Sequence, residues 1–259
     1  MLSSTNARLA AARRLTRRTA RRETGHFLAE GAPAVREALR ADAVLDLFAT
    51  ADAIERNADL LHGSDYSEIS PKDAAGLSET VTPQGLVAVC RAVDVELAAA
   101  LRRRPRLLAV LVEPNDPGNL GTIVRTADAA GAGAVVVVGG VDPYNGKAVR
   151  ASAGSLFHLD VVLAGDPDVT LAAMRDVGLS TLATTGTGRY DLDELDEDGS
   201  LDLPTAWYFG TEAHGLPQSV IDGADRAVRV PIHGRAESLN LAAAAAVCLY
   251  ASARAHRRA

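Results

Sequence analysis

The chain has 259 residues, of which 47% are hydrophobic and 4% aromatic, so we expect one large or two smaller domains with a core of Ala, Val, Leu and Ile. No apolar run approaches the roughly 20 residues that a membrane-spanning helix requires, and the two Cys and six His lack metal-ligand spacing, which predicts neither a membrane span nor a metal site. The net charge of −6 argues by itself against nucleic-acid binding. The charge is uneven, however: residues 1–106 carry 16 Lys and Arg against 14 Asp and Glu, whereas residues 107–259 carry 11 against 19. Local patches, not the total charge, decide where a polyanion binds.

The first 22 residues form a basic segment with seven Arg and no acidic residue. Transit peptides have a similar composition, but the segment runs into the next pattern without a break, so we interpret it as a helix of the mature protein. On one helix, six of its arginines would form a broad basic face, which is either a solvated surface or a phosphate-binding surface. The absence of acidic partners favours RNA binding by these six residues: Arg13, Arg17 and Arg21 in one row, and Arg14, Arg18 and Arg22 in the next.

Residues 1–97 alternate between strand and helix patterns and are predicted to form a small α/β domain. Residues 98–106, which include four Arg, are predicted to form a partly helical linker. Strands are expected over 26–31, 44–50 and 86–93, and helices over 32–41, 51–61 and 69–80, the last with Ser70 as its N-cap and Pro71 in its first turn.

Residues 107–259 show a longer β-α alternation, which predicts a parallel sheet with helices on both faces. The continuous apolar run at 107–112 is typical of a buried parallel strand. The acidic stretch 191–204 is expected to be a solvated surface loop. Strands are expected over 107–114, 134–140, 159–164, 180–185, 206–212 and within 220–232, and helices over 119–130, 147–159, 171–178 and 238–255.

The first of three polar motifs, Asn115–Gly131, follows the strand at 107–114 and turns into a helix. Arg125 lies six residues after Asn119, and a helix N-terminus beside an arginine is a ready anion site. The two glycines of the turn are three residues apart and lack the G-x-G-x-x-G spacing. A dinucleotide-binding loop, and with it a small-molecule dehydrogenase, is therefore disfavoured.

The second and third motifs also place small or polar residues beside an apolar run. In Phe209–Pro217, the glycines allow close backbone approach or a positive φ. In Glu237–Tyr250, Ser238 fits the N-cap of an Ala-rich helix, whereas Asn240, then inside the first turn, is not explained by capping.

Together and in this order, the three motifs resemble the SpoU/TrmH branch of the SPOUT methyltransferases. Residues 1–97 resemble, more loosely, the ribosomal-protein-like substrate-binding domain that precedes the catalytic domain in several rRNA 2′-O-methyltransferases. The resemblance implies an α/β protein whose C-terminal parallel-sheet domain contains a trefoil knot. It also implies a cytoplasmic homodimer that methylates the ribose 2′-hydroxyl of RNA with S-adenosyl-L-methionine and without a metal.

The resemblance further implies roles for individual residues. A guanidinium, whose pKa exceeds about 12, is a poor base, so we expect Arg125 to bind the phosphate beside the target ribose and to stabilise charge on the attacking oxygen. In a homodimer, Arg125 would serve the cofactor of the partner. The implied catalytic group is Arg125, Asn119, Glu212, Ser238 and Asn240, and the implied cofactor-binding residues are Gly210, Gly215, Leu216, Val230, Ile232 and Leu239.

Some alternatives stay open at this point. The substrate is rRNA or tRNA, and the N-terminal domain favours rRNA by analogy. A non-catalytic RNA-binding protein of the same fold is disfavoured by the intact polar residues of the motifs. The sequence identifies neither the modified nucleotide nor a housekeeping or an antibiotic-resistance role.

Overall fold

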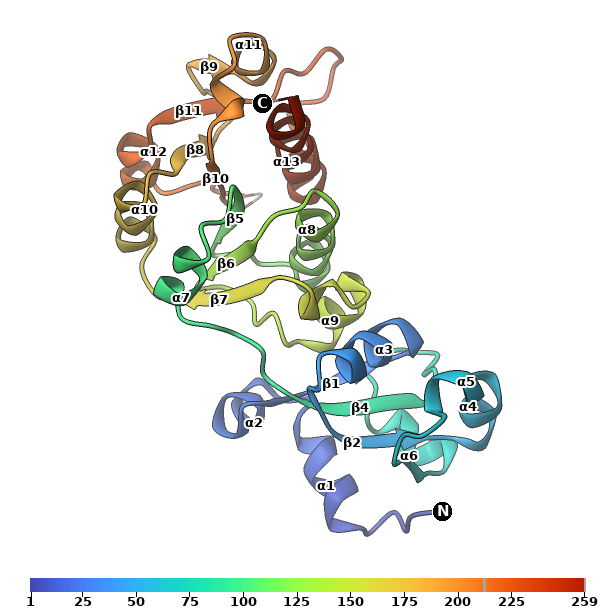
Figure 1. Cartoon of the computed structure of the whole chain (residues 1–259). Helices are drawn as coiled ribbons and strands as arrows, with labels where there is room; N and C mark the ends of the chain where they lie inside the picture. Colours follow the sequence, from blue (N-terminus) through green and yellow to red (C-terminus); the bar gives the residue numbers. More distant parts are fainter. Residues whose placement is uncertain (212, 259) are drawn as a thin grey trace. The chain divides into compact units, whose positions relative to one another are not determined.

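A computed structural model describes residues 1–211 and 213–258 and shows two compact units (Figure 1). The N-terminal unit comprises Met1–Val93 together with Asp142–His158, and the C-terminal unit comprises Asp94–Val141 and Leu159–Ala259. The segment Asp142–His158 lies in the second half of the sequence, yet it folds with the first.

The N-terminal unit is built on a mixed sheet, the N-terminal sheet, with the strand order β1-β4-β2-β3 among the residues described. β4 runs antiparallel to β1 and β2, whereas β3 is parallel to β2. The strands are β1 (His26–Glu30), β2 (Val44–Ala49), β3 (Ser67–Glu68) and β4 (Leu86–Arg91), and the helices are α1 (Ala7–Arg14), α2 (Arg18–Thr24), α3 (Ala32–Arg40), α4 (Ala51–Arg56), α5 (Ala58–Leu61), α6 (Pro71–Ala75) and α9 (Gly146–Ser152), with a 3-10 turn at Ser155–Phe157.

The prediction of one continuous basic helix at the N-terminus is wrong. α1 ends at Arg14, Arg17 is extended (φ −97°, ψ 133°), and α2 begins at Arg18. Leu15 still has helical φ and ψ and packs in the core with Leu9 and Ala12, so the helical path is lost only after it, at Arg17. The Arg21 side chain then turns inward and donates to the Leu15 and Thr16 carbonyl oxygens, at 2.9 and 3.0 Å.

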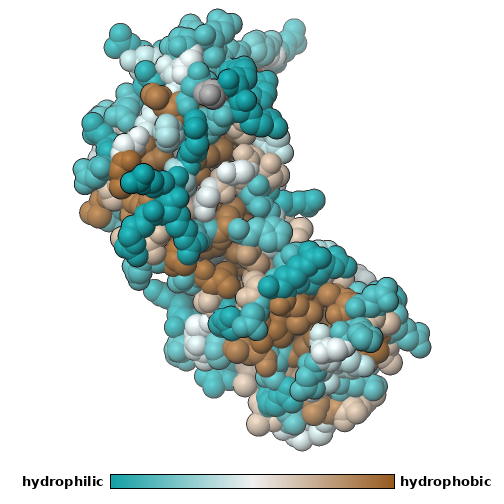
Figure 2. All heavy atoms as spheres, viewed as in Figure 1, coloured by the Kyte–Doolittle hydropathy of each residue, from teal (hydrophilic) through white to brown (hydrophobic). Residues whose placement is uncertain are grey.

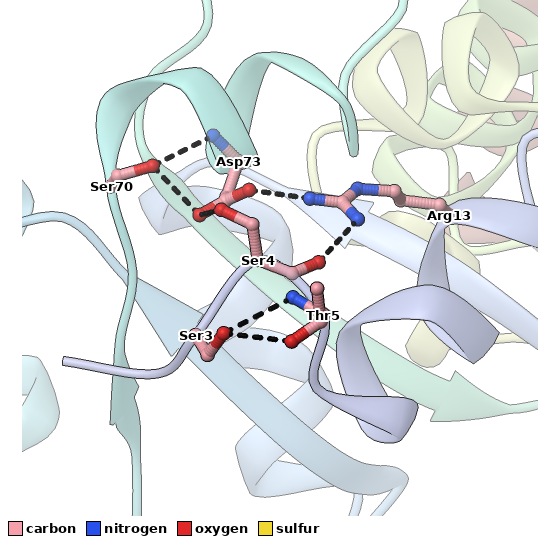
Figure 3. Close-up of polar contacts among 6 residues, drawn as sticks. All are labelled: Ser3, Ser4, Thr5, Arg13, Ser70 and Asp73. Atoms are coloured by element: carbon pink, nitrogen blue, oxygen red, sulfur yellow. Dashed lines mark hydrogen bonds and ion pairs between the residues drawn. The ribbon is translucent and has the colours of Figure 1, made fainter.

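Arg13 is also engaged inside the unit (Figure 3). Its guanidinium pairs with Asp73, whose side chain is 3% exposed, and donates to the Ser4 carbonyl oxygen at 3.0 Å. The hydroxyls of Ser70 and Ser4 donate to the same carboxylate at 2.7 and 3.0 Å, and these bonds, with the charge of Arg13, lower the pKa of Asp73. Ser70 also accepts from the Asp73 amide, so its predicted role as N-cap is confirmed, although α6 is shorter than predicted.

The C-terminal unit contains the predicted parallel sheet, the C-terminal sheet, with the strand order β7-β6-β5-β10-β8-β11-β9 within the described ranges. Every pairing in this order is parallel, so the prediction of a parallel α/β domain is confirmed. The strands are β5 (Leu107–Val112), β6 (Ala134–Val138), β7 (Asp160–Ala164), β8 (Ser180–Thr184), β9 (Tyr190–Asp191), β10 (Thr205–Phe209) and β11 (Arg226–Arg229).

Helices cover both faces of this sheet (Figure 1). α8 (Pro117–Ala129) and α13 (Leu241–Arg258) pack together on one face, and α10 (Pro167–Asp176) packs with α12 (Gln218–Gly223) on the other, which α7 (Leu97–Arg102) also covers. Neighbouring residues of β10 point to opposite faces. The Trp207 indole donates to Ser252 of α13 at 2.9 Å, whereas Tyr208 lies in the apolar cluster beneath α10 and α12.

The acidic stretch at 191–204 is not the solvated loop that we expected. It contains β9, the helix α11 (Leu192–Glu197) and a 3-10 turn at Ser200–Asp202. The leucines between the acidic residues are buried, and Asp191 and Asp196 pair with arginines of β11 and α13. The other acidic residues face solvent, and Figure 2 shows hydrophilic residues at this end of the unit.

Candidate active site

A cavity of about 270 Å³ lies at the carboxyl edge of the C-terminal sheet. Its walls come from the ends of β8, β10 and β11 and from the start of α13. The carboxyl edge of a parallel sheet is where such folds place their binding sites, because loops from several strands converge there. The lining residues are Thr184, Thr185, Gly186, Gly210, Thr211, Gly215, Val228, Val230, Ile232, Glu237, Ser238, Leu239, Leu241 and Ala244.

The structure brings most of the predicted cofactor-binding residues together around this cavity. Gly210, Gly215, Val230, Ile232 and Leu239 all line it. Leu216 does not: its side chain is 6% exposed and packs in the apolar core with Tyr208 and Val220.

Position 210 needs a glycine because the backbone of Gly215 lies too close for any side chain, whether or not a ligand is bound. A Cβ at this position would lie 2.1 Å from the Gly215 carbonyl carbon, so no larger residue fits. The close approach accompanies a small loop in which the Thr211 and Gly215 amides donate to each other's carbonyl oxygens at 3.1 and 2.9 Å. Gly215 itself has φ +66°, and a Cβ added there would meet no atom within 4 Å. The turn therefore leaves bare backbone beside the cavity.

The first and third motifs meet beside the cavity, although they are 121 residues apart in sequence. The Asn240 side-chain amide donates to the Asn119 side-chain oxygen at 3.3 Å. Asn119 lies in the first turn of α8, which Asp116 caps by accepting from the Asn119 amide at 2.8 Å. The pair joins the beginnings of α8 and α13, so polar groups of both motifs converge.

The predicted capping of the last helix is wrong. α13 begins at Leu241, and the Asn240 side-chain oxygen accepts from the amides of Ala242 and Ala243, at 2.9 and 3.4 Å. Asn240 is thus the N-cap, and Ser238 precedes the helix and lines the cavity. The helix starts later than predicted, and residues 232–240 form an exposed connection from β11 that contains bends and neither helix nor strand.

Arg125 lies on α8 with its side chain exposed, and it makes no ion pair with any residue that the structure describes. An exposed guanidinium six residues after Asn119 is free to bind an external anion. The remaining predicted catalytic residue, Glu212, lies outside the described residues.

Several lining residues escaped the sequence analysis. Thr185 and Gly186 follow the end of β8 and lie in a Thr-Gly-Thr-Gly run, the same kind of small-residue turn at a strand end that identified the other motifs. Glu237, at the start of the third motif, also lines the cavity and supplies a negative charge to it. In the part of the chain that is described, no group of His, Cys, Asp and Glu is arranged to bind a metal, and no helix is both long and apolar enough to span a membrane.

Comparison with known proteins identifies the family. Residues 106–250 match the SpoU rRNA Methylase family, which is more than half of the chain. The chain belongs to the SpoU rRNA methylase family. Residues 6–88 match the MRM3-like substrate binding domain.

Relatives and solved structures agree with this family. The 23S rRNA (guanosine(2553)-2′-O)-methyltransferase RlmP of Bacillus subtilis (strain 168) is 34% identical over 231 residues, which is 89% of either chain. The SpoU methyltransferase AviRb from Streptomyces viridochromogenes, solved in complex with the cofactor AdoMet, has a TM-score of 0.85 and 29% identity, covering 98% of this chain and 100% of that one. An AdoMet-bound rRNA methyltransferase from Sinorhizobium meliloti has a TM-score of 0.81 and 31% identity, covering 98% and 97%. The fold of this SpoU family member is therefore that of a SPOUT domain preceded by a substrate-binding domain.

The cavity fits S-adenosylmethionine. Val230, Ile232 and Leu239 offer apolar contact, and Ile232 and Leu239 are each 38% exposed, which leaves their side chains available to a flat adenine. Gly186, Gly210 and Gly215 leave backbone accessible, so ligand hydrogen bonds can be made to main-chain groups. The carboxylate of Glu237 suits a ligand that carries an ammonium and a sulfonium.

Proposed function

We propose that this protein transfers the methyl group of S-adenosyl-L-methionine to a ribose 2′-hydroxyl of rRNA. The observation that carries the proposal is the convergence of the three family motifs: the cavity at the ends of β8, β10 and β11, the Asn119–Asn240 pair beside it, and the exposed Arg125 on α8. The match of residues 6–88 to a substrate-binding domain, and the 23S rRNA named for the relative RlmP, favour rRNA.

Different residues of the cavity would bind different parts of the cofactor. The apolar side chains of Val230, Ile232 and Leu239 would contact the adenine, and Gly210 and Gly215 would present backbone groups. When bound, S-adenosylmethionine supplies an electrophilic methyl group on a sulfonium sulfur. Thr185, Glu237 and Ser238 would bind its polar groups.

Arg125 is proposed to bind the phosphate next to the target ribose and to stabilise negative charge on the 2′-oxygen. A guanidinium is a poor base, so we assign Arg125 no proton transfer. Asn119 and Asn240, which are hydrogen-bonded to each other, are proposed to orient the ribose together with Ser238 and with Glu212, which lies outside the described residues.

RNA binding by the N-terminal segment is proposed for the arginines that the fold leaves available. Arg14, Arg17, Arg18 and Arg22 are exposed. Arg14 lies 3.8 Å from Glu23, a pair that is more than 60% exposed on both sides and therefore weak. Arg13 is already paired and Arg21 is buried, so we propose that they support the segment instead of contacting RNA.

We further propose a cytoplasmic homodimer in which Arg125 serves the cofactor of the partner subunit. The exposed connection 232–240 and the exposed Val247 and Tyr250 of α13 support a second copy, since exposed apolar side chains on one element can mark an interaction surface. We propose residues 1–97 as the RNA-binding domain, 98–106 as a linker and 107–259 as the methyltransferase domain, which the matches over 6–88 and 106–250 support. The two compact units depart from these bounds, because α7 packs in the C-terminal unit and Asp142–His158 folds with the N-terminal unit.

The test is transfer of radiolabelled methyl from S-adenosylmethionine to total rRNA and to total tRNA, followed by nucleoside analysis. We expect label in a 2′-O-methylnucleoside from rRNA. Arg125→Ala should lower the transfer rate by about 100-fold or more, the usual loss of a transition-state donor, and should leave cofactor affinity within about twofold, because Arg125 does not line the cavity.

Arg102→Ala is the matched control, since Arg102 is an exposed arginine on α7, which covers the other face of the sheet. It should retain full activity. Label in tRNA alone would overturn the substrate, and full activity of Arg125→Ala would overturn the role of that residue.

A further inference from the structure

The segment Asp142–His158 interrupts the catalytic unit to complete the N-terminal unit. The chain leaves the C-terminal unit after Val141, forms α9 and the 3-10 turn against the N-terminal sheet, and returns after His158 to enter β7. Residues that belong to the proposed RNA-binding unit are therefore directly continuous, at Val141–Asp142, with residues that belong to the proposed catalytic unit.

Charged groups hold the segment along its whole length. At its start, Arg21 Nε donates to Asp142 Oδ2 at 2.8 Å, and the two side chains are 5% and 11% exposed. In its middle, Arg150 pairs with Glu30 of β1, whose side chain is 4% exposed. At its end, His158 lies 3.2 Å from a carboxylate oxygen of Glu37 in α3. Such buried partners make the segment a structural part of the N-terminal unit.

Aromatic packing reinforces these pairs. The ring of Phe27 in β1 lies 4.6 Å from that of Tyr144 and 6.0 Å from that of Phe157, measured between centroids. The Tyr144 hydroxyl accepts from the Val93 amide at 2.9 Å. Phe27 is fully buried, so displacement of the segment would expose the end of the N-terminal core.

Residues 140–141, just before the segment, pack against the loop 113–116 that precedes α8. The Val141 amide donates to the Pro114 carbonyl oxygen at 2.9 Å, and a Cβ on Gly140 would lie 2.5 Å from that same oxygen. Glu113 has φ +51°, a left-handed conformation that an L-residue adopts only when its surroundings impose it. This loop leads to Asp116, which caps α8, and hence to Asn119.

Arg21 contacts both Asp142, the first residue of the segment, and the break between α1 and α2. Its guanidinium binds Asp142 and also the Leu15 and Thr16 carbonyl oxygens at the break between α1 and α2. The exposed arginines Arg14, Arg17, Arg18 and Arg22 flank that break. The Arg21 side chain thus links the basic segment to Asp142. Asp142 directly follows Val141, whose amide is hydrogen-bonded to Pro114 in the loop before α8.

We propose that Arg21 and Asp142 are positioning residues for methyl transfer, which couple RNA contact by the basic segment to the loop that begins α8. The proposal rests on the proposed function. Neither side chain touches the cofactor cavity, so both act through the backbone segments 15–16 and 139–142. RNA that fixes the basic segment then also stabilises the catalytic conformation of the start of α8.

The experiment compares Asp142→Asn with Asp73→Asn in the full-length protein. Both replacements break an arginine–aspartate pair in the N-terminal unit, but Asp73 has no contact with the segment 142–158. We measure kcat and KM with rRNA, the cofactor affinity, and thiol labelling of Cys90, which is fully buried in β4 and reports opening of the N-terminal unit. Asp142→Asn should lower kcat/KM by about tenfold with unchanged cofactor affinity, Asp73→Asn should stay within about twofold of wild type, and Asp142→Glu should recover activity.

Equal losses in the two asparagine variants, or no loss in Asp142→Asn, would overturn the coupling and leave a purely structural pair. If Asp142→Asn exposes Cys90 in the absence of denaturant, the double variant Arg21→Met with Asp142→Leu replaces the buried charges by apolar groups, an exchange that often preserves stability. It should keep Cys90 protected and still lose activity, because methionine cannot bind the carbonyl oxygens at the break; full activity would refute the proposal.

A failure of the proposed function gives a different result. If the wild-type protein transfers no methyl group, amide hydrogen exchange tests the coupling by itself. Addition of rRNA should slow exchange at residues 113–118 in wild type and not in the double variant. Unchanged exchange in wild type, with RNA bound, would overturn the coupling.

Discussion

The division of the N-terminal arginines into exposed and engaged side chains leads to a quantitative prediction about RNA binding. The variant replaces Arg14, Arg17, Arg18 and Arg22, the four exposed ones, by Gln. Each phosphate contact on a single strand contributes about 0.7 to the slope of log K against log salt concentration, so four lost contacts should lower that slope by about 2.8. When the salt concentration rises from 50 to 200 mM, the affinity of both proteins for RNA falls. The factor by which it falls should be about 50 times smaller for the variant than for wild type.

Fluorescence anisotropy with a labelled rRNA fragment at several salt concentrations measures both slopes. The control is Arg13→Gln, which removes an arginine already paired with Asp73 and should leave the slope unchanged while lowering stability. An unchanged slope in the fourfold variant would show that the exposed arginines form only a solvated surface. A reduced slope in Arg13→Gln would show that the pair opens to bind RNA.

Two further predictions concern stability. The Tyr208 hydroxyl is buried without a hydrogen-bond partner among the described residues, whereas its neighbour Trp207 donates to Ser252. Tyr208→Phe should therefore stabilise the protein by about 1 kcal/mol, and Trp207→Phe should destabilise it by about 2 kcal/mol or more. Urea unfolding followed by circular dichroism measures both changes. Destabilisation by Tyr208→Phe would mean that the hydroxyl has a partner. Hydrogen bonds from Ser70 and Ser4 and the charge of Arg13 lower the pKa of Asp73 below its ordinary 3.8, so its contribution to stability is complete above about pH 4 and is lost as the pH falls through the folded-state value. Asp73→Asn should accordingly flatten the decline of unfolding free energy between pH 4 and pH 2, and an unchanged decline would contradict this reasoning.

The sequence by itself determined the α/β class, the order of most strands and helices, and the three motifs. These features depend on periodicity over a few residues: apolar runs such as 107–112 become buried parallel strands, and glycines at strand ends become turns. The same reasoning explains why the motifs lie at one edge of the sheet, since all of them follow the carboxyl ends of parallel strands. It also explains why Thr185 and Gly186 could have been found in the same way.

The tertiary structure alone decided which side chains meet. Periodicity favoured one basic helix, but the helix is interrupted at Arg17, and Arg21 turns inward to Asp142, 121 residues further along the chain. The preference of serine for the N-cap position predicted Ser238 as the cap of the last helix. The capping residue is instead Asn240, which also bonds to Asn119, 121 residues away in the sequence. A buried charge such as that of Arg21 must find a partner wherever the folded chain brings one, and that partner is set by packing, not by neighbours in sequence.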